Sequence, residues 1–398
     1  MRAARVLVIG GGVIGLSTAY HLALRGAAEV ILLEKDICGA GSSGRAAGII
    51  TGLLWSETGI LARKRSLARF RELSHELPGY SFQDVGCLNL FDPASWPQRQ
   101  ALLPLYDRLG VPYEILDAGQ IRKRWPTLTP SENEIGLFDP LGGYSEPDEY
   151  IPALARAARQ RGVTIQEGVQ VTSFVQRSAR IAGVKTTASA IGADAVVCAV
   201  HAWAPMLLGL AGVRLPVKAF VHQRYLTEQL AGPIALPAVN ANTLGGYIRP
   251  ASGDRLLLGA ETPEREEHRV ADMGFRMSQL TAPAGLGAET VRRFSSLAPG
   301  LHGLSCMEER VGLIAFSMDG EPILGPVAQM SGLFLGAAFH SGGFAYNPVA
   351  GLLLAQMVLD EQTEIDLKAF AVDRFPPAQI DSYVDETITQ AQVFRRRH

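Results

Sequence analysis

Hydrophobic and polar positions are ordered most clearly in the first forty residues of the chain. Residues 6–9 form a short apolar run that is typical of a buried strand, and residues 16–26 show the spacing of a helix. A second apolar run, at residues 30–33, ends at the acidic residue Glu34. This order predicts two parallel strands that are joined by a helix.

The rest of the chain alternates between helical and strand-like patterns. Helices are predicted over 60–77, 97–109, 147–161, 289–297, 349–359 and 381–394. Strands are predicted over 80–91 (as a pair), 111–116, 163–174, 194–199, 310–316 and 333–337. A loop-rich connector is expected over 120–130, and antiparallel strands of a second domain are expected over 216–259.

Composition and charge narrow the class of protein. The chain has 398 residues, 47% of them hydrophobic and 19% charged, as in a globular protein of two domains with a large core. The net charge of −2 provides no basic surface for nucleic acid, and no apolar run is long enough to predict a membrane span. The cysteines are scattered without metal-binding spacing. We expect no metal site, reduced thiols, and a cytoplasmic protein or one bound peripherally to a membrane.

The turn after the first strand carries glycines at the spacing GxGxxG. Gly10 allows a tight turn out of the strand, Gly12 lets a pyrophosphate approach the backbone, and Gly15 lets helix and strand pack closely. Glu34 follows Gly15 by nineteen residues, where an acid can accept hydrogen bonds from ribose hydroxyls. Strand, glycines, helix, strand and acid in this order predict a dinucleotide-binding site.

A second stretch of small residues, GAGSSGRAAGII at 39–50, follows this unit. Small residues let the backbone pass close to a ligand, and Ser42, Ser43 and Arg45 can reach phosphate oxygens. An NAD site needs no such loop, whereas the longer FAD molecule could use one. A further glycine-rich turn, HSGGF at 340–344, precedes another predicted helix. The loop and the two turns together favour FAD over NAD.

With these motifs in place, the chain resembles the D-amino-acid-oxidase superfamily of FAD-dependent oxidoreductases. It is most similar to the sarcosine-oxidase branch and to the β-subunit of archaeal dye-linked L-proline dehydrogenase. The motifs that carry the resemblance are VIGGGVIGLSTAYHLA, LLEKDICGAGSSGRAAGI, ARKRSLARFREL, AVHAWAP, VHQ, GGYIRP, DGEPILGP and FHSGGFAYNPVAG. The implied fold class is α/β with α+β: a Rossmann-like FAD-binding domain with a discontinuous antiparallel-sheet substrate domain.

The resemblance also implies domain boundaries and cofactor contacts. The FAD-binding domain would comprise residues 1–78, 145–215 and 310–398, ending in a C-terminal helix, and the substrate domain 79–144 and 216–309. The implied FAD contacts are Gly10, Gly12, Val13, Ile14, Gly15, Glu34, Lys35, Gly41, Ser42, Ser43, Arg45, Ala46, Ala47, Gly48, Val171, Ala199, Trp203, Gly312, Ser341, Gly342, Gly343 and Phe344. A helix N-terminus at the second glycine turn would stabilise the negative charge of reduced flavin.

Departures from the family pattern limit what the resemblance implies. Relatives that attach flavin covalently use a His where this chain has Arg45, or a Cys where it has Gly312, so FAD is expected to be non-covalent. The carboxylate-binding Arg of D-amino-acid and glycine oxidases falls at Ile314, which counts against these activities. A Lys of sarcosine oxidases is replaced by Ala345, and the Lys that promotes their oxygen reaction falls near Arg249. A dehydrogenase is therefore favoured over an oxidase.

Four residues are candidates for acting on a substrate. Arg249 could bind a substrate carboxylate with Tyr247 as a second donor, although a surface arginine and a core tyrosine are open alternatives. His222 could help to deprotonate a substrate amine, because imidazole titrates near neutral pH. His340 lies beside the flavin by resemblance and could tune it. For both histidines a purely structural role is an equal alternative.

The implied reaction is the oxidation of an amino acid. A hydride would pass from the carbon next to nitrogen to flavin N5, giving an imine. The expected substrate is a secondary amine such as L-proline, hydroxyproline or sarcosine. The alternatives are a D-amino-acid or 2-hydroxy-acid oxidoreductase, and a flavin subunit that is active only in a hetero-oligomer. The electron acceptor would be a quinone, a dye, a partner flavin or O2, and a homo- or hetero-oligomer is open.

Overall fold

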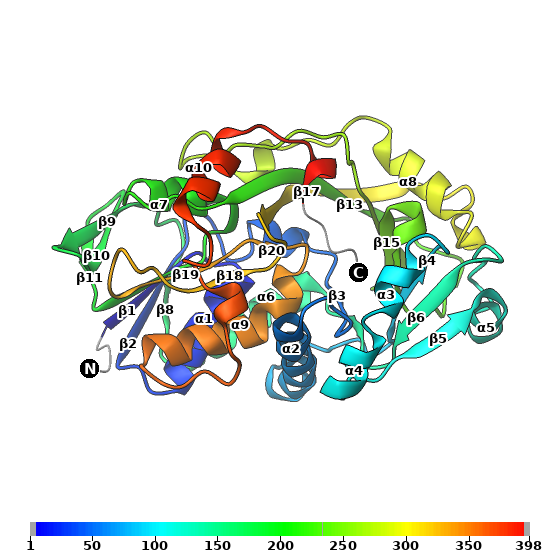
Figure 1. The fold of residues 1–398 in the computed structure, drawn as a ribbon, viewed down its shortest axis with the longest axis horizontal. Coiled ribbons are helices and arrows are strands. Elements are labelled where there is room, and N and C mark those ends of the chain that lie inside the picture. The colour runs from blue at the N-terminus through cyan, green and yellow to red at the C-terminus, as the bar shows by residue number, and fades with distance from the viewer. Residues whose placement is uncertain (1–4, 233, 394–398) are drawn as a thin grey trace.

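Two large sheets lie side by side along the long axis of the molecule (Figure 1). The structure is a computed structural model that describes residues 5–232 and 234–393. Within these ranges one large sheet has six strands and the other has nine.

The six-stranded sheet contains the predicted strand–helix–strand unit. Its order is β18 (Ile323–Pro326), β19 (Leu333–Ala337), β12 (Ala195–Cys198), β1 (Arg5–Ile9), β2 (Glu29–Leu33) and β8 (Thr164–Gln166). Neighbouring strands are parallel except β18 and β19, which are antiparallel. Because β1 lies inside this sheet, the glycine turn after it opens at the carboxyl edge, where α/β folds bind their ligands.

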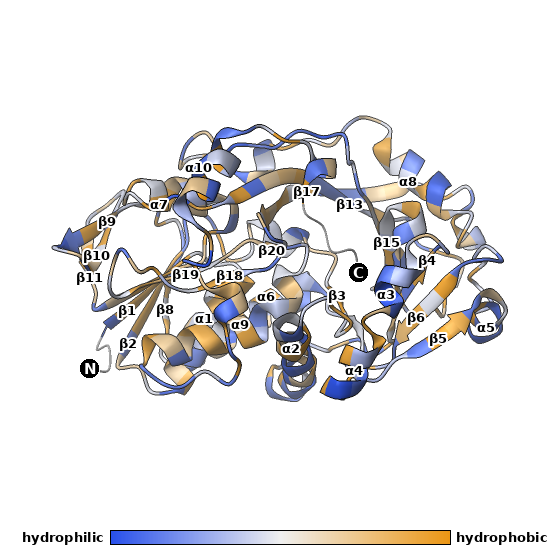
Figure 2. Ribbon diagram, viewed as in Figure 1, coloured by the Kyte–Doolittle hydropathy of each residue, from blue (hydrophilic) through white to orange (hydrophobic). Residues whose placement is uncertain are grey.

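Alternate residues of β1 face two different layers. Val8 packs with α1 (Val13–Leu24) and α9 (Gly343–Val358), whereas Ile9 packs with a smaller sheet on the opposite face. This smaller sheet consists of β9 (Val171–Arg177), β10 (Arg180–Thr186) and β11 (Ala190–Gly192). Because both faces are covered, the central strands are hydrophobic at every position rather than at every second one, as Figure 2 shows.

Helices α1 and α9 are packed closely, with backbone against backbone. A Cβ atom added to Gly351 of α9 would lie only 2.3 Å from Ser17 Oγ of α1. Two further helices complete this layer: α2 (Glu57–Glu76) packs against α9, and α6 (Pro147–Gln160) packs against α1. This packing fixes the start of α1 and the start of α9 relative to each other, and both starts are glycine turns.

The nine-stranded sheet is almost entirely antiparallel. Its order is β20 (Phe339–His340), β17 (Cys306–Ser317), β13 (Val217–Thr227), β16 (Arg255–Ala260), β15 (Gly246–Ala251), β14 (Ala238–Ala241), β4 (Cys87–Phe91), β6 (Ile135–Asp139) and β5 (Glu114–Asp117). Only β14 and β4 are parallel among its described pairs. The antiparallel sheet predicted from 216–259 is therefore confirmed, and the fold is a Rossmann-like domain combined with a sheet-rich domain.

The remaining elements connect the two sheets. They are β3 (Ile49–Ile50), β7 (Gly143–Tyr144), α3 (Trp96–Gln100), α4 (Leu103–Leu109), α5 (Ala118–Arg124), α7 (Ala204–Gly209), α8 (Leu286–Phe294) and α10 (Pro377–Asp385). Among the helices of the described ranges, none combines the length and the apolar character that crossing a bilayer requires.

Some predicted elements are divided at prolines and glycines. Residues 97–109 form two helices, α3 and α4, because Pro104 near the start of α4 has no N–H to continue the first helix. Residues 163–174 form two strands, β8 and β9, in different sheets, and Gly168 separates them with a φ of +75°. Residues 80–91 contain the strand β4 instead of a pair.

Helix α9 begins at the second glycine turn rather than at residue 349. Pro348 lies inside this helix and cannot donate a backbone hydrogen bond to the carbonyl of Phe344. The side chain of Asn347 donates to that carbonyl instead, with 2.6 Å between Nδ2 and O. The helix therefore continues up to the HSGGF turn.

Two further predictions are wrong at helix ends. The predicted connector 120–130 begins inside helix α5, which a capping box between Asp117 and Gln120 stabilises at its start. The surface helix predicted over 381–394 ends at Asp385. Its last predicted residue, Phe394, and the three arginines after it lie outside the described residues.

Candidate active site

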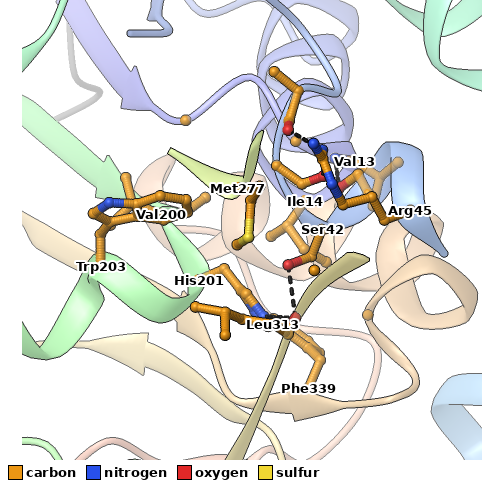
Figure 3. A pocket seen from close by; sticks show the side chains of 18 of the residues that line it. Val13, Ile14, Ser42, Arg45, Val200, His201, Trp203, Met277, Leu313 and Phe339 are labelled. Carbon is orange, nitrogen blue, oxygen red and sulfur yellow. Dashed lines mark hydrogen bonds between the residues drawn. The ribbon is translucent and has the colours of Figure 1, made fainter. Parts of the chain in front are cut away.

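A cavity of about 210 Å³ lies at the carboxyl edge of the six-stranded sheet and faces strand β17 (Figure 3). It brings together most of the predicted cofactor residues, which come from segments far apart in the chain. Those that line it are Gly10, Gly12, Val13, Ile14, Glu34, Lys35, Gly41, Ser42, Ser43, Arg45, Ala46, Ala47, Val171, Ala199, Trp203, Gly312, Ser341, Gly343 and Phe344.

Gly15 and Gly48 are predicted FAD contacts that do not line this cavity. Each lies directly against the backbone of another residue. A Cβ atom on Gly15 would lie 1.9 Å from the carbonyl oxygen of Gly10, so the glycine lets α1 start directly against the turn. Gly48 has a φ of +73°, and a Cβ atom there would lie 2.0 Å from the carbonyl oxygen of Ser145. Both positions require glycine for packing rather than for contact with a ligand.

Side chains hold the first glycine turn in place. Glu34 accepts hydrogen bonds from the backbone N–H of Gly11 at 2.7 Å and of Asp36 at 2.8 Å. Ser43 Oγ accepts one from the N–H of Val13 at 3.0 Å. Burial raises the pKa of Glu34. Each carboxylate oxygen keeps a second lone pair, so Glu34 can still accept a hydrogen bond from a hydroxyl.

Two residues tie strand β17 to the rim of the cavity. Ser42 Oγ donates to the carbonyl oxygen of Leu313 at 2.7 Å, and His201 Nε2 lies 2.9 Å from the same oxygen. Figure 3 shows both side chains directed at Leu313. Burial lowers the pKa of His201, so the neutral ring donates through Nε2. The sequence pattern did not predict a role for His201, although it lies in the AVHAWAP motif.

A second cavity, of about 150 Å³, adjoins the first at the second glycine turn. The two share six lining residues: His222, Tyr247, Ile314, Phe339, His340 and Ser341. The predicted contact Gly342 lines only the second cavity. A molecule in the second cavity would therefore lie beside the ligand of the first.

Three of the four candidate substrate residues line this junction. The hydroxyl of Tyr247 lies 3.2 Å from His222 Nε2. Burial is the main cause that raises the pKa of Tyr247 to about 12, so its hydroxyl stays protonated. The tautomer of the imidazole decides which of the two groups donates this hydrogen bond. His340 has a positive φ of 56°, and its Nε2 lies 3.3 Å from Ser317 Oγ.

The fourth candidate, Arg249, is not where the sequence predicts it to act. Its side chain is fully buried, and it lines neither cavity. Its guanidinium forms a bidentate ion pair with Glu146 at 2.7 and 2.8 Å, and Nε donates to the carbonyl oxygen of Ala47 at 2.6 Å. Arg249 therefore fastens β15 to the cofactor loop and does not present its charge to a substrate.

A different arginine, Arg63 of helix α2, lines the second cavity. It is 2% exposed, stacks 4.2 Å from the ring of Tyr346, and lies close to Gly342, where a Cβ atom would be 2.3 Å from Nη2. Among the described residues no carboxylate forms an ion pair with it, and its Nε has no hydrogen-bond partner. Sequence reasoning missed Arg63, yet it shares a helical face with Ile60, Leu67 and Phe70, where an arginine is unexpected.

Comparison with known proteins places the chain in a family. The family model described as "FAD dependent oxidoreductase" (DAO) matches residues 5–357. The chain belongs to this family.

The chain is similar to several characterised members of the DAO family. It is 30% identical, over 93% of its length, to 4-methylaminobutanoate oxidase (formaldehyde-forming) of Paenarthrobacter nicotinovorans, but it spans only 45% of that enzyme. It is 26% identical to sarcosine oxidase subunit beta of Arthrobacter sp, covering 93% of this chain and 90% of that subunit. The crystal structure of L-proline dehydrogenase from P. horikoshii superimposes with a TM-score of 0.86, at 26% identity, covering 94% of this chain and 98% of that one.

The first cavity fits the FAD of the DAO family. Trp203 lines it and has a buried indole N–H without a hydrogen-bond partner, which an acceptor on a ligand would satisfy. A Cβ atom on Gly12 would lie 2.9 Å from Ser43 Oγ, so only glycine leaves the backbone open there. Lys35 lies 4.0 Å from the Trp203 ring, and burial lowers the pKa of this lysine to about 8.

The two positions at which a covalent link to FAD was considered, Gly312 and Arg45, lie at the cavity, and non-covalent FAD stays a prediction. Gly312 has no side chain, and a Cβ atom there would lie 2.9 Å from Arg45 Cδ. Arg45 itself donates from Nη1 to the carbonyl oxygens of Gly41, at 3.0 Å, and Ala40, so this nitrogen stabilises its own loop. Across the described residues, no group of three or more His, Cys, Asp or Glu side chains is arranged to hold a metal ion.

Proposed function

We propose that the protein oxidises a small amino acid at the carbon next to nitrogen, and that the substrate is a secondary amine such as L-proline, hydroxyproline or sarcosine. The observation that carries this proposal is Arg63, a buried cation without a carboxylate partner in a cavity that adjoins the cofactor site. The relatives named above support the same class of substrate.

A buried guanidinium is costly unless an anion or several acceptors compensate it. Within the described residues, Arg63 gains the ring face and the hydroxyl of Tyr346 and one long contact to the carbonyl oxygen of Thr51, at 3.5 Å. A substrate carboxylate in the second cavity would supply the missing negative charge and two acceptors. Arg63 thus takes the role that the sequence assigned to Arg249.

The same cavity is also lined by two carboxylates, those of Glu261 and Glu321. The negative charge of Glu261 acts on Tyr247, where it adds to burial in raising the pKa of the tyrosine. A cavity with a guanidinium from α2 and a carboxylate at the end of β16 suits a zwitterion. This polarity favours an amino acid over a 2-hydroxy acid, which has no positive end.

FAD and the protein side chains would carry out different parts of the reaction. When bound, FAD supplies the acceptor for the hydride. Arg63 orients the carboxylate, and Glu261 attracts the ammonium group. The Tyr247 hydroxyl takes a proton from the ammonium while it passes its own proton to His222 Nε2, 3.2 Å away. The neutral amine that results can release a hydride, and the electrons then leave to a quinone, a dye, a partner flavin or O2.

An anaerobic titration tests this proposal. L-Proline, trans-4-hydroxy-L-proline and sarcosine are added one at a time to the FAD-loaded protein, and the flavin absorbance is recorded. We expect at least one of them to bleach the flavin band. The proposal is wrong if fully loaded protein is bleached by none of these amines.

An Arg63→Met variant tests the role of Arg63 directly. We expect the dissociation constant of the reactive amine to rise about 100-fold, because losing a charge-assisted contact of two hydrogen bonds costs about 2–3 kcal/mol. Its FAD content should equal that of the wild type, since Arg63 lies outside the cofactor cavity. An unchanged dissociation constant would exclude Arg63 as the carboxylate partner.

A further inference from the structure

One wall of the second cavity comes from a segment far along the chain. Residues 386–393, here called the strap, run antiparallel to residues 263–267. Backbone hydrogen bonds of 2.8–3.0 Å join the two segments. The strap is thus an ordered part of the sheet-rich side of the molecule.

Charged and apolar contacts fasten the strap to β13 and β17. Lys218 of β13 donates to the backbone carbonyl oxygen of Glu386 in the strap. It also forms an ion pair of 2.6 Å with Glu267 of the segment with which the strap pairs. Ile388 of the strap packs in one apolar cluster with Phe220 and Phe316. Because β13 also carries His222, the strap and the proposed proton acceptor are held on the same strand.

Gln390 is the strap residue that lines the second cavity. It is 1% exposed and begins a short 3-10 turn, Gln390–Gln392, which a capping box between Thr389 and Gln392 stabilises. The turn fixes the backbone of Gln390, so its amide has a defined place in the cavity. Other polar residues, among them Asn240, Asn242, Glu261 and Glu321, line the same cavity.

Burying an amide at this position costs free energy. It costs about 1–3 kcal/mol unless its hydrogen bonds are made, whereas an apolar residue could close the cavity without this cost. An amide has two N–H donors and an oxygen with two lone pairs, so it can hold several hydrogen-bond partners at once. The cavity has a mixed lining, in which apolar and aromatic side chains such as Leu54, Trp55 and Phe316 alternate with polar and charged ones.

We propose that Gln390 selects the substrate by hydrogen-bonding a hydroxyl or amide group that the substrate carries besides its amine and carboxylate. The inference rests on the proposed function, in which Arg63 and Glu261 receive the two charged ends. Gln390 belongs to the second cavity alone, so it would meet the part of the substrate that faces away from the cofactor. A site built to hydrogen-bond a substrate group discriminates strongly against an analogue without it.

Substrate pairs that differ by one hydroxyl test this inference. We would compare L-proline with trans-4-hydroxy-L-proline, and N-methyl-L-alanine with N-methyl-L-serine, by anaerobic flavin reduction. The wild type should favour the hydroxylated member of a pair by about 10-fold in apparent affinity, and Gln390→Leu should remove this preference. Gln379→Leu, at an exposed position of α10, is the matched control and should keep it.

A binding measurement keeps the inference testable without turnover. Propionate and 3-hydroxypropionate are titrated into the FAD-loaded protein, and their dissociation constants are read from the perturbed flavin spectrum. The role of Gln390 is supported if Gln390→Leu abolishes a hydroxyl preference while FAD content and melting temperature stay unchanged. This holds even if no amine bleaches the flavin. In that case only the proposed function fails. If Gln390→Leu keeps the wild-type preference, or the wild type has none, the inference is wrong although amines may still reduce the flavin.

Discussion

Two buried arginines show how one residue type serves two purposes in this protein. Arg249 has a carboxylate partner, Glu146, whereas the described residues offer Arg63 none. The sequence predicts a substrate contact at Arg249 because the GGYIRP motif surrounds it. It cannot show that Glu146, 103 residues away, already neutralises that charge. Ion pairs between residues far apart in the sequence therefore decide which guanidinium is available to a ligand.

Replacing Arg249 should act on stability. Arg249→Met would leave Glu146, which is 16% exposed, as an uncompensated buried charge. We expect the free energy of unfolding to fall by about 3–5 kcal/mol in urea titrations. The double variant Arg249→Met, Glu146→Gln should lose less than the sum of the two single changes. A loss below about 1 kcal/mol for the single variant would contradict the structural role.

The predicted cofactor residues illustrate what sequence alone can reveal. Those near the two glycine turns were placed in one cavity, since short motifs such as GxGxxG dictate their own local geometry. His201 and Gln390 also line the cavities, but the sequence pattern assigns no role to either of them, although His201 lies in the AVHAWAP motif. Their positions depend on Leu313 and on residues 263–267, which only the folded chain brings near.

At the scale of elements, boundaries were predicted less well than the elements themselves. The first strand, helix and second strand were all confirmed. The sequence predicts one strand over 163–174, whereas Gly168, with its positive φ, divides this segment into two strands that belong to different sheets. The strap was predicted as a helix because its buried residues, Ile388 and Val393, suit either structure.

The contact between α1 and α9 gives a prediction about helix packing. In Gly351→Ala, the new Cβ would lie 2.5 Å from the backbone carbon of Ser17, so one helix must move. We expect the free energy of unfolding to fall by about 2 kcal/mol, and FAD affinity to fall with it, because both helices begin at the cofactor cavity. Thermal unfolding with and without added FAD would measure both effects.

A second glycine provides the control for this experiment. Gly209, at the end of α7, is exposed, and a Cβ atom added there would meet no neighbouring atom within 4 Å. Gly209→Ala should therefore leave stability unchanged or raise it by up to about 1 kcal/mol. If both variants lost the same stability, close packing of α1 and α9 would not be the cause.

At the scale of the whole molecule, stability should depend on pH through His21. This imidazole is buried on α1, and burial, together with the charges of Arg69 and Arg25, lowers its pKa from 6.5 to about 3. Between these values the unfolded chain binds a proton that the folded chain does not. The free energy of unfolding should therefore fall as pH decreases, by up to about 1.4 kcal/mol per pH unit.

Comparing wild type with His21→Gln isolates this contribution. Urea titrations at pH 7, 6 and 5 give the free energy of unfolding of each protein. Below pH 6.5, the free energy of unfolding of the wild type should fall more steeply with decreasing pH than that of the variant. The difference between the two slopes should approach about 1.4 kcal/mol per pH unit. If the difference in free energy of unfolding between the two proteins does not change with pH, a group other than His21 causes the loss of stability at low pH.

The cofactor cavity draws its lining from residue 9 to residue 344. A chain emerging from the ribosome therefore cannot complete the cavity until the start of α9 has left the exit tunnel. We expect FAD to bind tightly only once the start of α9 has packed beside the start of α1. The fraction of active molecules would then follow the flavin supply of the cell, and a shortage would leave apoprotein that a later supply can still load.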